Sequence, residues 1–375
     1  GGTWTQQGSK LIGTGAVGSA AQGYSVAISG DGNTAIIGGY SDNTNAGAAW
    51  IFTRSGGVWS QQGTKLVGTG AVGLAQQGSS VSISADGNTT IIGGRSDDAG
   101  AGAAWVFTRS GNIWTQQGSK LVGTGGVPNP TIFAISVSLS ADGNTAMIGR
   151  SSDNLSTGAV WVFVRNIGVW SQQGSKIVGT GAIGSSSQGY SVSLSSDGNN
   201  ALVGGWLDNT NTGAVWMFNR GSTTWMQTGE KLVGTGGVGS GQQGFSVALS
   251  SDGTTAMIGG WLDNGQTGAT WIFTGNTTEV KEYEPNLPSK FSLQQNYPNP
   301  FNPSTSIKYT IDSRQFVNLK VYDLLGREVA TLVNEENPAG NYEVNFDASR
   351  LSSGVYFYKL KAGSFVETKK MILLR

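Results

Sequence analysis

A phrase of about a dozen residues recurs through the first three quarters of the chain. It reads VWSQQGTKLVGTG from Val58 onward and returns with small changes. Its tryptophan stands at Trp4, Trp59, Trp114, Trp170 and Trp225, so the intervals are 55 or 56 residues. A fixed period of this length indicates a repeat architecture, in which each unit is a small set of secondary-structure elements that packs on its neighbours.

Each unit carries signals for four short strands. GYSVAIS alternates apolar and small polar residues, and TAIIGG, GAAWIFTR and VWSQQGTKL follow it. An Asp-Gly pair separates the first two strand-like segments, which predicts a tight hairpin of type I′ with positive φ at both residues. We interpret the aspartates of these pairs as turn residues. They are Asp31, Asp86, Asp142, Asp197 and Asp252.

The third strand of each unit is apolar on both faces. In GAAWIFTR, Trp50 and Phe52 fall on one face and Ala49 and Ile51 on the other. A sheet covered on both sides predicts four-stranded sheets stacked around an axis, which is a β-propeller. An open solenoid would need polar capping units, and the sequence has none that we recognise. We therefore predict an all-β fold with a five-bladed β-propeller over residues 1–275.

The fifth unit lacks the fourth-strand phrase, whereas the chain begins with it. If Trp4–Leu11 pairs with the strand at Ala269–Thr274, the N-terminal strand closes the ring and no strand edge stays open. The alternative is part of a larger ring that another chain completes. The chain starts at Gly1 without an initiator Met, and we interpret it as a form processed during export.

Composition excludes several classes of function. The chain has no His and no Cys, and its 23 Lys and Arg balance its 23 Asp and Glu. This excludes thiol nucleophiles, disulfides and Cys/His metal sites, and it gives no electrostatic basis for binding nucleic acid. No apolar run reaches the roughly 20 residues of a membrane span. We expect no cofactor, no metal and no transmembrane segment.

The units resemble the FG-GAP family of propeller repeats found in bacterial surface proteins. The segments that carry this resemblance are QGYSVAISGDGNTAIIGG and its counterparts, each followed by a GAxWxF-like segment. The name-giving GAP is replaced by GGY, GGR, GRS or GGW, and the loops hold too few aspartates for the six to eight oxygens that calcium needs. We interpret the loop aspartates as Asx-type caps. They are Asp42, Asp97, Asp153, Asp208 and Asp263.

The C-terminal part has a different composition and a different pattern. Residues 276–290 read as a polar linker, and residues 291–375 carry six or seven alternating strands, which predict an immunoglobulin-like β-sandwich. NYPNPFNPST, VYDLLGREV, GVYFYKL and KKMILLR resemble the type A C-terminal sorting domain of the type IX secretion system of Bacteroidetes. The resemblance implies contact with the secretion machinery, export across the outer membrane, and an extracellular or cell-surface location.

The charges give no sign of catalysis. Almost every charge repeats with the units, whereas a catalytic site needs a few residues in distinct roles. The departures are Arg95, Arg150, Asp98, Glu230 and the insert Val127–Phe133. No pair of unique carboxylates stands out for acid–base work. We expect that the chain is not an enzyme.

We expect a secreted structural protein that binds other copies of itself and assembles into an extracellular filament or layer, with the C-terminal domain at the junction. An extensive contact between residues 276–375 of one copy and the propeller of another would support this expectation. The assembly and sorting residues that we predict are Lys369, Lys370, Met371, Ile372, Leu373 and Leu374.

The alternative is a monomeric adhesin whose propeller binds a surface glycan or a protein. The residue after the second strand of each unit varies, and these positions should cluster at one end of the ring. Exposed aromatic rings there could stack on sugars, although they could equally just cover the blade ends. The candidate ligand-binding residues are Tyr40, Arg95, Trp206 and Trp261.

Overall fold

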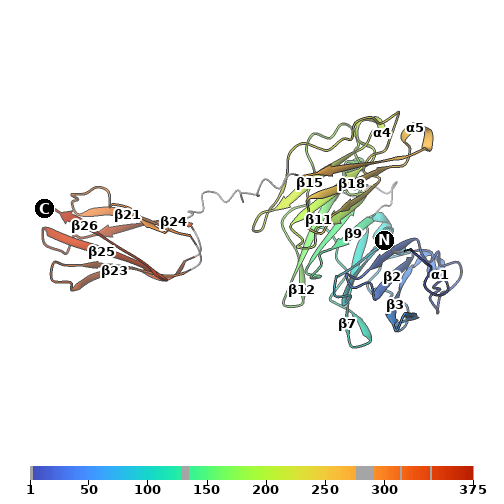
Figure 1. Cartoon of the computed structure of the whole chain (residues 1–375), viewed down its shortest axis with the longest axis horizontal. Helices are drawn as coiled ribbons and strands as arrows, with labels where there is room; N and C mark the ends of the chain where they lie inside the picture. The colour runs from blue at the N-terminus through green and yellow to red at the C-terminus, as the bar shows by residue number, and fades with distance from the viewer. Residues whose placement is uncertain (1–2, 128–134, 276–290, 313–314, 338–339, 375) are drawn as a thin grey trace. The chain divides into compact units, whose positions relative to one another are not determined.

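The computed structural model describes residues 3–127, 135–275, 291–312, 315–337 and 340–374. The chain divides into two compact units, Gly1–Thr277 and Thr278–Arg375, which we describe separately (Figure 1). The predicted linker, residues 276–290, lies outside the described residues. So does most of the insert, from Pro128 to Phe133.

The first unit consists of consecutive antiparallel sheets, one for each sequence repeat. Within a sheet the strands pair in chain order, as alternating segments joined by turns predict. The sheets comprise β1 (Ser25–Ile28), β2 (Thr34–Gly39), β3 (Ala48–Ser55) and β4 (Val58–Gln61); β5 (Gln77–Ile83), β6 (Thr89–Gly94), β7 (Ala103–Ser110) and β8 (Ile113–Gln116); β9 (Ile135–Leu139), β10 (Thr145–Arg150), β11 (Ala159–Asn166) and β12 (Val169–Gln172); β13 (Ser191–Leu194), β14 (Asn200–Gly205), β15 (Ala214–Arg220) and β16 (Trp225–Gln227); and β17 (Ser246–Leu249), β18 (Thr255–Gly260) and β19 (Ala269–Thr274).

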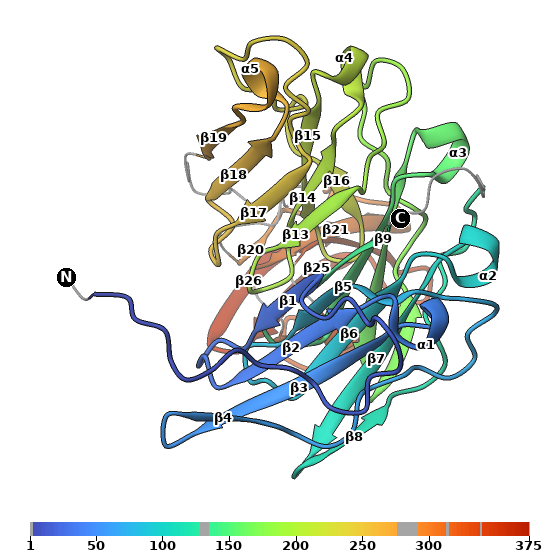
Figure 2. The ribbon, with the colours of Figure 1, turned by 90° about the vertical axis from the view of Figure 1, so that its right-hand side faces the viewer.

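A single helical turn separates the second and third strands of each sheet. These turns are α1 (Asp42–Asn45), α2 (Asp97–Gly100), α3 (Asp153–Ser156), α4 (Asp208–Asn211) and α5 (Asp263–Gln266). Figure 2 shows the first strands of the sheets gathered near the centre of the unit, with the helical turns along its rim. This radial order is the one that the repeat predicts.

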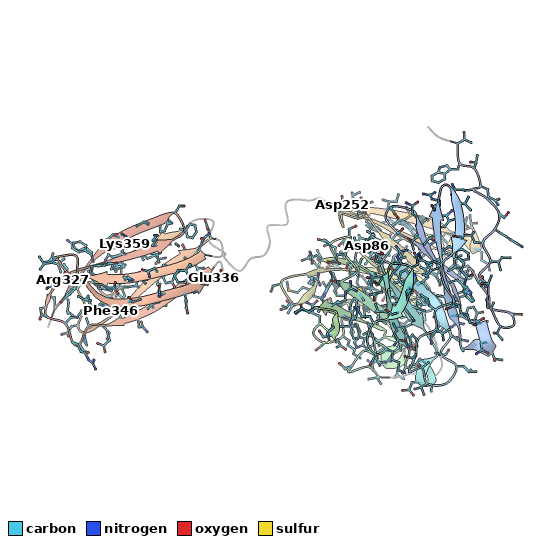
Figure 3. The ribbon with its side chains drawn as sticks, turned by 90° about the horizontal axis from the view of Figure 1, so that it is seen from below. Asp86, Asp252, Arg327, Glu336, Phe346 and Lys359 are labelled. Carbon is cyan, nitrogen blue, oxygen red and sulfur yellow. The ribbon has the colours of Figure 1, made fainter. Side chains whose placement is uncertain are left out.

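The Asp-Gly turns are more elaborate than a two-residue hairpin. Gly32 has φ of 68°, but Asp31 is not among the residues with positive φ, so the type I′ prediction is wrong. The Asp31 carboxylate instead accepts hydrogen bonds from the Ser29 hydroxyl (2.5 Å) and the Asn33 backbone N–H (2.9 Å). The aspartate therefore braces the turn from inside, and the glycine alone takes the left-handed conformation. Figure 3 marks Asp86 and Asp252 at the same position of other sheets.

These turns should make the first unit sensitive to acid. Hydrogen bonds from Ser29 and Asn33 lower the pKa of Asp31 to about 2. Because the folded pKa is depressed, the stabilisation is complete above the unfolded pKa of about 4 and is lost as the pH falls towards 2. We expect the urea midpoint of the first unit to hold steady from pH 7 to about pH 5 and to fall between pH 4 and pH 2. A flat profile down to pH 2 would contradict this expectation.

Adjacent sheets of the first unit pack through opposite faces. We call the side towards the following sheet the forward face and the other side the backward face. At the first junction, Ile36 and Ile51 of the forward face are fully buried against Val81 and Ile83 of the backward face. Four backbone hydrogen bonds of 2.9 Å also link the sheets in series, from Gly30 to Ala85, Ala141, Ser196 and Ser251. The second, third and fourth sheets each lie between two neighbours.

The predicted closure by the N-terminal strand is wrong for this structure. In the described part of the chain, β19 pairs only with β18, and Trp4–Leu11 forms no strand. The Trp4 side chain is 99% exposed. No backbone hydrogen bond between described residues leads from Ser251 back to Gly30, so the series of sheets stays open.

The first sheet holds the residues before it by the same contacts that each later sheet uses. The Trp50 indole N–H donates to the Thr14 carbonyl (2.8 Å), and the Gln22 side chain bonds both the N–H and the carbonyl of Gly13. These contacts fix residues 13–22 on the first sheet. The faces at the two ends of the open series are uncovered.

The uncovered faces are apolar. On the backward face of the first sheet, Val26 and Ile28 are 68% and 59% exposed. On the forward face of the fifth sheet, Met257 and Ile272 are 48% and 64% exposed. The residues at the same repeat positions inside the series are largely buried. Each end of the series therefore presents an exposed apolar surface of the kind that binds another protein surface.

The second unit has two antiparallel sheets around one hydrophobic core. Six or seven strands were predicted for this part, and its described residues form seven. One sheet is β20 (Ser292–Leu293), β21 (Ser304–Ile311) and β24 (Gly340–Asp347); the other is β23 (Glu328–Asn337), β22 (Gln315–Tyr322), β25 (Gly354–Ala362) and β26 (Phe365–Leu373). Phe346 lies on β24, and Arg327 and Glu336 mark the two ends of β23 (Figure 3).

Candidate functional site

Aromatic side chains gather where the first strand of a sheet begins and the second strand ends. Antiparallel pairing brings these two positions together, so Tyr24, just before β1, contacts Tyr40, just after β2. The two rings meet edge to face with centroids 4.5 Å apart. We call the set of such residues the aromatic end. Its members are Tyr24, Tyr40, Arg95, Tyr190, Trp206, Phe245 and Trp261.

Arg95 joins the second sheet to the aromatic pair of the first. Its guanidinium lies 4.7 Å from the Tyr40 ring centroid and 5.7 Å from that of Tyr24. Its Nε donates to the Gln76 Oε1 at 2.6 Å, which fixes the plane of the group. The result is a cation stacked on two partly exposed rings.

Phe245 lies at the centre of the aromatic cluster formed by residues of the fourth and fifth sheets. Its ring centroid lies 4.9 Å from Tyr190, 6.2 Å from Trp206 and 5.9 Å from Trp261. Tyr190 and Trp206 also meet edge to face at 5.6 Å. Trp261 remains 46% exposed, so the cluster presents aromatic surface to solvent.

The two aromatic groups share one electrostatic environment. Burial raises the pKa of the Tyr190 hydroxyl, the nearby Tyr24 raises it further, and Arg95 acts to lower it. Tyr24 of the first sheet and Arg95 of the second thus act electrostatically on Tyr190 of the fourth. An exposed surface of rings with one cation can stack on flat apolar groups, such as the faces of sugar rings, and can attract an anion.

The sequence identified only part of the aromatic end. Of the predicted residues, Tyr40 lies with Arg95, and Trp206 and Trp261 lie on either side of Phe245. Sequence reasoning missed Tyr24, Tyr190 and Phe245. Their signal was available, because the residue after the recurring Gln-Gly varies between tyrosine, serine and phenylalanine.

The unique charged residues do not form a second site. Arg150 is 6% exposed, donates from Nη2 to Asp153 (2.6 Å) and from Nη1 to the Ala101 carbonyl (2.9 Å), and lies over Trp161. It is a structural group. Glu230 is exposed to solvent. Among the described residues, no three His, Cys, Asp or Glu side chains are grouped as metal ligands.

The loop aspartates have a role that the sequence reading missed. The Asp42 carboxylate accepts from the Val17 N–H (2.7 Å) and binds Lys65 (2.5 Å), so the prediction of an Asx-type cap is wrong. The signal was a lysine 23 residues after four of the five loop aspartates. The same ion pair recurs in three further units, as Asp97 with Lys120, Asp153 with Lys176, and Asp208 with Lys231.

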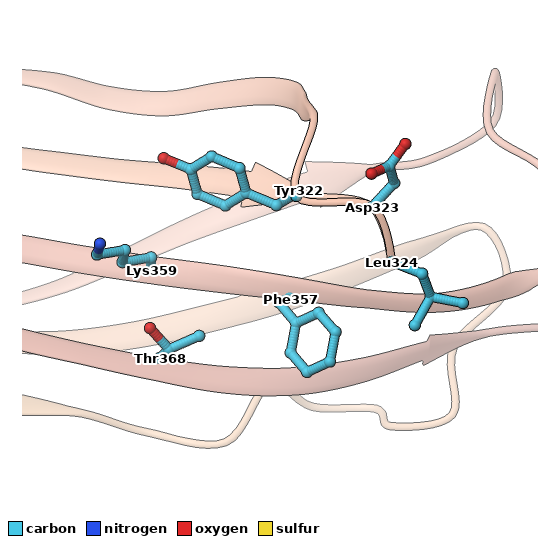
Figure 4. Close-up of a pocket in the computed structure, with 7 residues that line it drawn as sticks. Tyr322, Asp323, Leu324, Phe357, Lys359 and Thr368 are labelled. Atoms are coloured by element: carbon cyan, nitrogen blue, oxygen red, sulfur yellow. The ribbon is translucent and has the colours of Figure 1, made fainter.

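The predicted assembly and sorting residues form the last strand of the second unit and its end. Met371 and Leu373 are fully buried in the core, Lys369 pairs with Glu367 (3.1 Å), and the Leu374 N–H donates to the Phe301 carbonyl. Beside this strand, a hollow of about 360 Å³ is lined by residues of β22, β25 and β26 and of the turn after β22 (Figure 4). Figure 4 shows Tyr322, Leu324 and Phe357 at this hollow.

The burial of Met371 predicts that export depends on the core of the second unit. Met371→Asp places a carboxylate in a dry core, which costs several kcal/mol and should unfold the unit. We expect the variant to accumulate in the periplasm, as measured by cell fractionation. Leu374→Asp is the control, because Leu374 is 52% exposed, and it should reach the surface. Equal export of the two variants would contradict the prediction.

The described helices are single turns, and none is long and apolar enough to span a membrane. Repeated antiparallel sheets followed by a compact two-sheet domain define the class of the protein as a modular all-β protein. A match to a known family is found in the second unit. Residues 295–374 match the family described as the secretion system C-terminal sorting domain. The chain therefore carries a type IX sorting tail and is exported to the cell surface or the extracellular space.

Several solved structures are similar to the chain at low identity. Hydrazine synthase of Kuenenia stuttgartiensis is 13% identical, with a TM-score of 0.41, over 67% of this chain and 59% of its own. PorZ, a surface component of the type IX secretion system of Porphyromonas gingivalis, is 14% identical, with a TM-score of 0.33, over 93% and 51%. The β-propeller domain of the Trilobed protease from Pyrococcus furiosus is 10% identical, with a TM-score of 0.34, over 92% and 94%.

The chain thus spans 59% of the hydrazine synthase chain and about half of PorZ. Because all three TM-scores are below 0.5, none supports an inference about activity. No curated protein sequence matches the chain at a significant level.

Proposed function

We propose that the chain is a secreted, non-enzymatic structural protein of the cell surface that associates with further copies of itself into a filament or layer. Its parts would be a five-bladed β-propeller and an immunoglobulin-like sandwich. The observation that carries the proposal is the pair of uncovered apolar faces at the ends of the sheet series, with Val26 and Ile28 on one and Met257 and Ile272 on the other.

Uncovered faces of this kind favour association between chains. Each face matches the buried partner of an internal junction, so the forward face of one copy suits the backward face of another. Such a contact joins different surfaces, and it continues indefinitely unless the rotation closes it into a ring. With no net charge, little repulsion opposes close approach of copies. A contact through the C-terminal domain could reinforce the same assembly.

The absence of His and Cys supports a non-enzymatic role, because both of the commonest groups for proton transfer and nucleophilic attack at neutral pH are missing. The repeated charges also pair with one another as structural bonds, as Lys65 does with Asp42. These side chains are already committed to holding the units together.

Electron microscopy of purified protein and of the native cell surface tests the proposal, together with sedimentation over a hundredfold range of concentration. We expect concentration-dependent assemblies, and we expect Ile28→Lys to reduce them while the monomer stays folded. Val58→Lys, on an exposed strand-turn position of the first sheet, is the matched control. A monomer at every concentration, with a bare cell surface, would reject the proposal.

The aromatic end favours a second candidate function, a surface adhesin that binds a glycan. Trp261 and Trp206 would stack on sugar rings, and Arg95 would bind an anionic substituent such as a carboxylate. Binding to a panel of immobilised glycans, measured with the full chain and with Trp261→Ala, tests this candidate. A glycan bound equally well by both would reject the aromatic end as its site.

A further inference from the structure

We propose that the fifth sheet of one copy is completed by the first residues of a second copy. We call Trp4–Leu11 the N-terminal arm. In this proposal the arm of one chain pairs with β19 of another and supplies its missing fourth strand. The inference rests on the proposed self-association and adds the residues that form its junction.

The N-terminal arm is already held where the fourth strand of a preceding sheet would lie. The Trp59 indole N–H donates to the Gln7 Oε1 at 3.0 Å, and Arg54 donates to the same oxygen at 3.2 Å. Inside the series, Gln62 accepts from Trp114 and Arg109 in the same way, across the junction between two sheets. The first sheet therefore binds Gln7 as the second sheet binds Gln62 of the sheet before it.

The fifth sheet lacks the partners that the N-terminal arm carries. Asp263 accepts from the Val238 N–H (2.7 Å) but has no lysine among the described residues, unlike the four equivalent aspartates. The lysine at the matching position of the phrase is Lys10. Because Asp263 is only 7% exposed, its carboxylate has much to gain from a cation.

Thr235 is a second residue of the fifth sheet without its usual partner in the described part of the chain. The equivalent threonine Thr180 donates from its N–H and hydroxyl to Gln227, on the fourth strand of its own sheet, at 2.7 and 3.1 Å. No such acceptor is bound to Thr235 in the described part of the chain. In the N-terminal arm, the matching glutamine is Gln6. Two polar vacancies on the fifth sheet thus correspond to two exposed residues of the arm.

Pairing of the N-terminal arm with β19 of a second copy would also cover the apolar faces at the two ends. Docking of the forward face of the fifth sheet on the backward face of the first brings Met257 and Ile272 towards Val26 and Ile28. At the first internal junction, Ile36 and Ile51 lie against Val81 and Ile83 in the corresponding places and are fully buried. The new junction would repeat contacts that the molecule already makes.

A second copy is favoured over the same chain because the internal junctions are closely packed. Bringing the fifth sheet to the first within one chain would require the rotation at the four junctions to change. Buried residues such as Trp105 and Trp216, both fully buried, resist such a change because close-packed cores do not deform continuously. Docking of a second copy leaves all four junctions as they are.

Cysteine cross-linking tests the proposal directly, since the chain has no native cysteine. β3 and β4 pair Thr53 with Ser60, and the corresponding residues of the new junction are Thr274 and Thr5. Both are exposed. We expect Thr5→Cys and Thr274→Cys proteins, mixed and oxidised, to form a disulfide-linked heterodimer. We expect the doubly substituted chain to give a ladder of oligomers.

The matched control mixes Thr274→Cys with Ser60→Cys, whose position is already paired with Thr53, and should give no cross-link. Lys10→Glu should weaken the expected cross-link several-fold, and Asp263→Lys in the partner chain should restore it. A doubly substituted chain that yields only an internally linked monomer would overturn the inference in favour of closure within one chain. If assemblies form but Thr5→Cys and Thr274→Cys do not cross-link, this junction is wrong and the proposed function stands. If no assemblies form, the proposed function fails with it.

Discussion

Gly68→Ala should strongly destabilise the first unit. A Cβ at Gly68 would lie 2.1 Å from Cδ1 of Trp105, a fully buried ring whose indole N–H also donates to the Thr69 carbonyl. Neither the ring nor the backbone can yield without losing that bond and the packing behind it. We expect a loss of about 3 kcal/mol in the free energy of unfolding, or more, measured by urea denaturation.

Gly221→Ala is the control for the Gly68 substitution. A Cβ at Gly221 would have its nearest neighbour at 3.7 Å, which is ordinary contact. This variant should unfold within about 0.5 kcal/mol of the parent protein. If the two variants had the same stability, the close contact between Gly68 and Trp105 would not stabilise the junction of the first and second sheets as the structure indicates.

Asp97→Asn should have an effect of similar size for a different reason. The substitution keeps an oxygen for the Val72 N–H but removes the charge that Lys120 binds at 2.5 Å. The aspartate side chain is 1% exposed and the lysine 19%, so the cation loses a buried partner. We expect a loss of roughly 3 kcal/mol in the free energy of unfolding at low protein concentration.

The chain offers a matched control for the Asp97 substitution. Asp263 makes the same bond to a backbone N–H but lacks a lysine in the described structure. Asp263→Asn should therefore cost the isolated chain less than about 1 kcal/mol. Equal losses at the two positions would show that the loop hydrogen bond, rather than the ion pair, holds the units together.

The sequence predicted the strands of both units because their signals are local. Alternation and turn residues identify each strand of a repeat, and the structure confirms those strands from β1 to β19. The strands predicted for the tail are confirmed in the same way. Each of these signals lies within about ten residues, which is the range over which turn chemistry and side-chain alternation act.

Apart from the type I′ turn, whose bonds are local, the errors concern contacts between distant residues. The pairing of Trp4–Leu11 with β19 depends on how far the sheets turn around the axis, and no local pattern encodes that rotation. The Asp42 carboxylate looked like a loop cap because its partners, Val17 and Lys65, stand 25 and 23 residues away. The repeat itself contained this information, since the lysine and the aspartate recur together.

The aromatic end lies between these two cases. The variable position after the second strand was visible as a break in the repeat, and it led to Tyr40, Arg95, Trp206 and Trp261. Phe245 was overlooked because it was read as part of a strand pattern rather than as a variable position. Only the structure places it between two tryptophans.

The series of glutamine bonds between sheets has a consequence for how the first unit comes apart. Each of Gln62, Gln117 and Gln173 is held by a tryptophan of the following sheet. Opening one sheet thus loosens its neighbours, as in a one-dimensional chain of coupled units. These bonds run from the first to the fourth sheet, and the fifth sheet packs on the fourth without one. The first and fifth sheets have a packed neighbour on one side only. Amide protons should therefore exchange fastest in the first and fifth sheets and slowest in the third sheet. A protease or an unfolding motor should likewise act first on a terminal sheet.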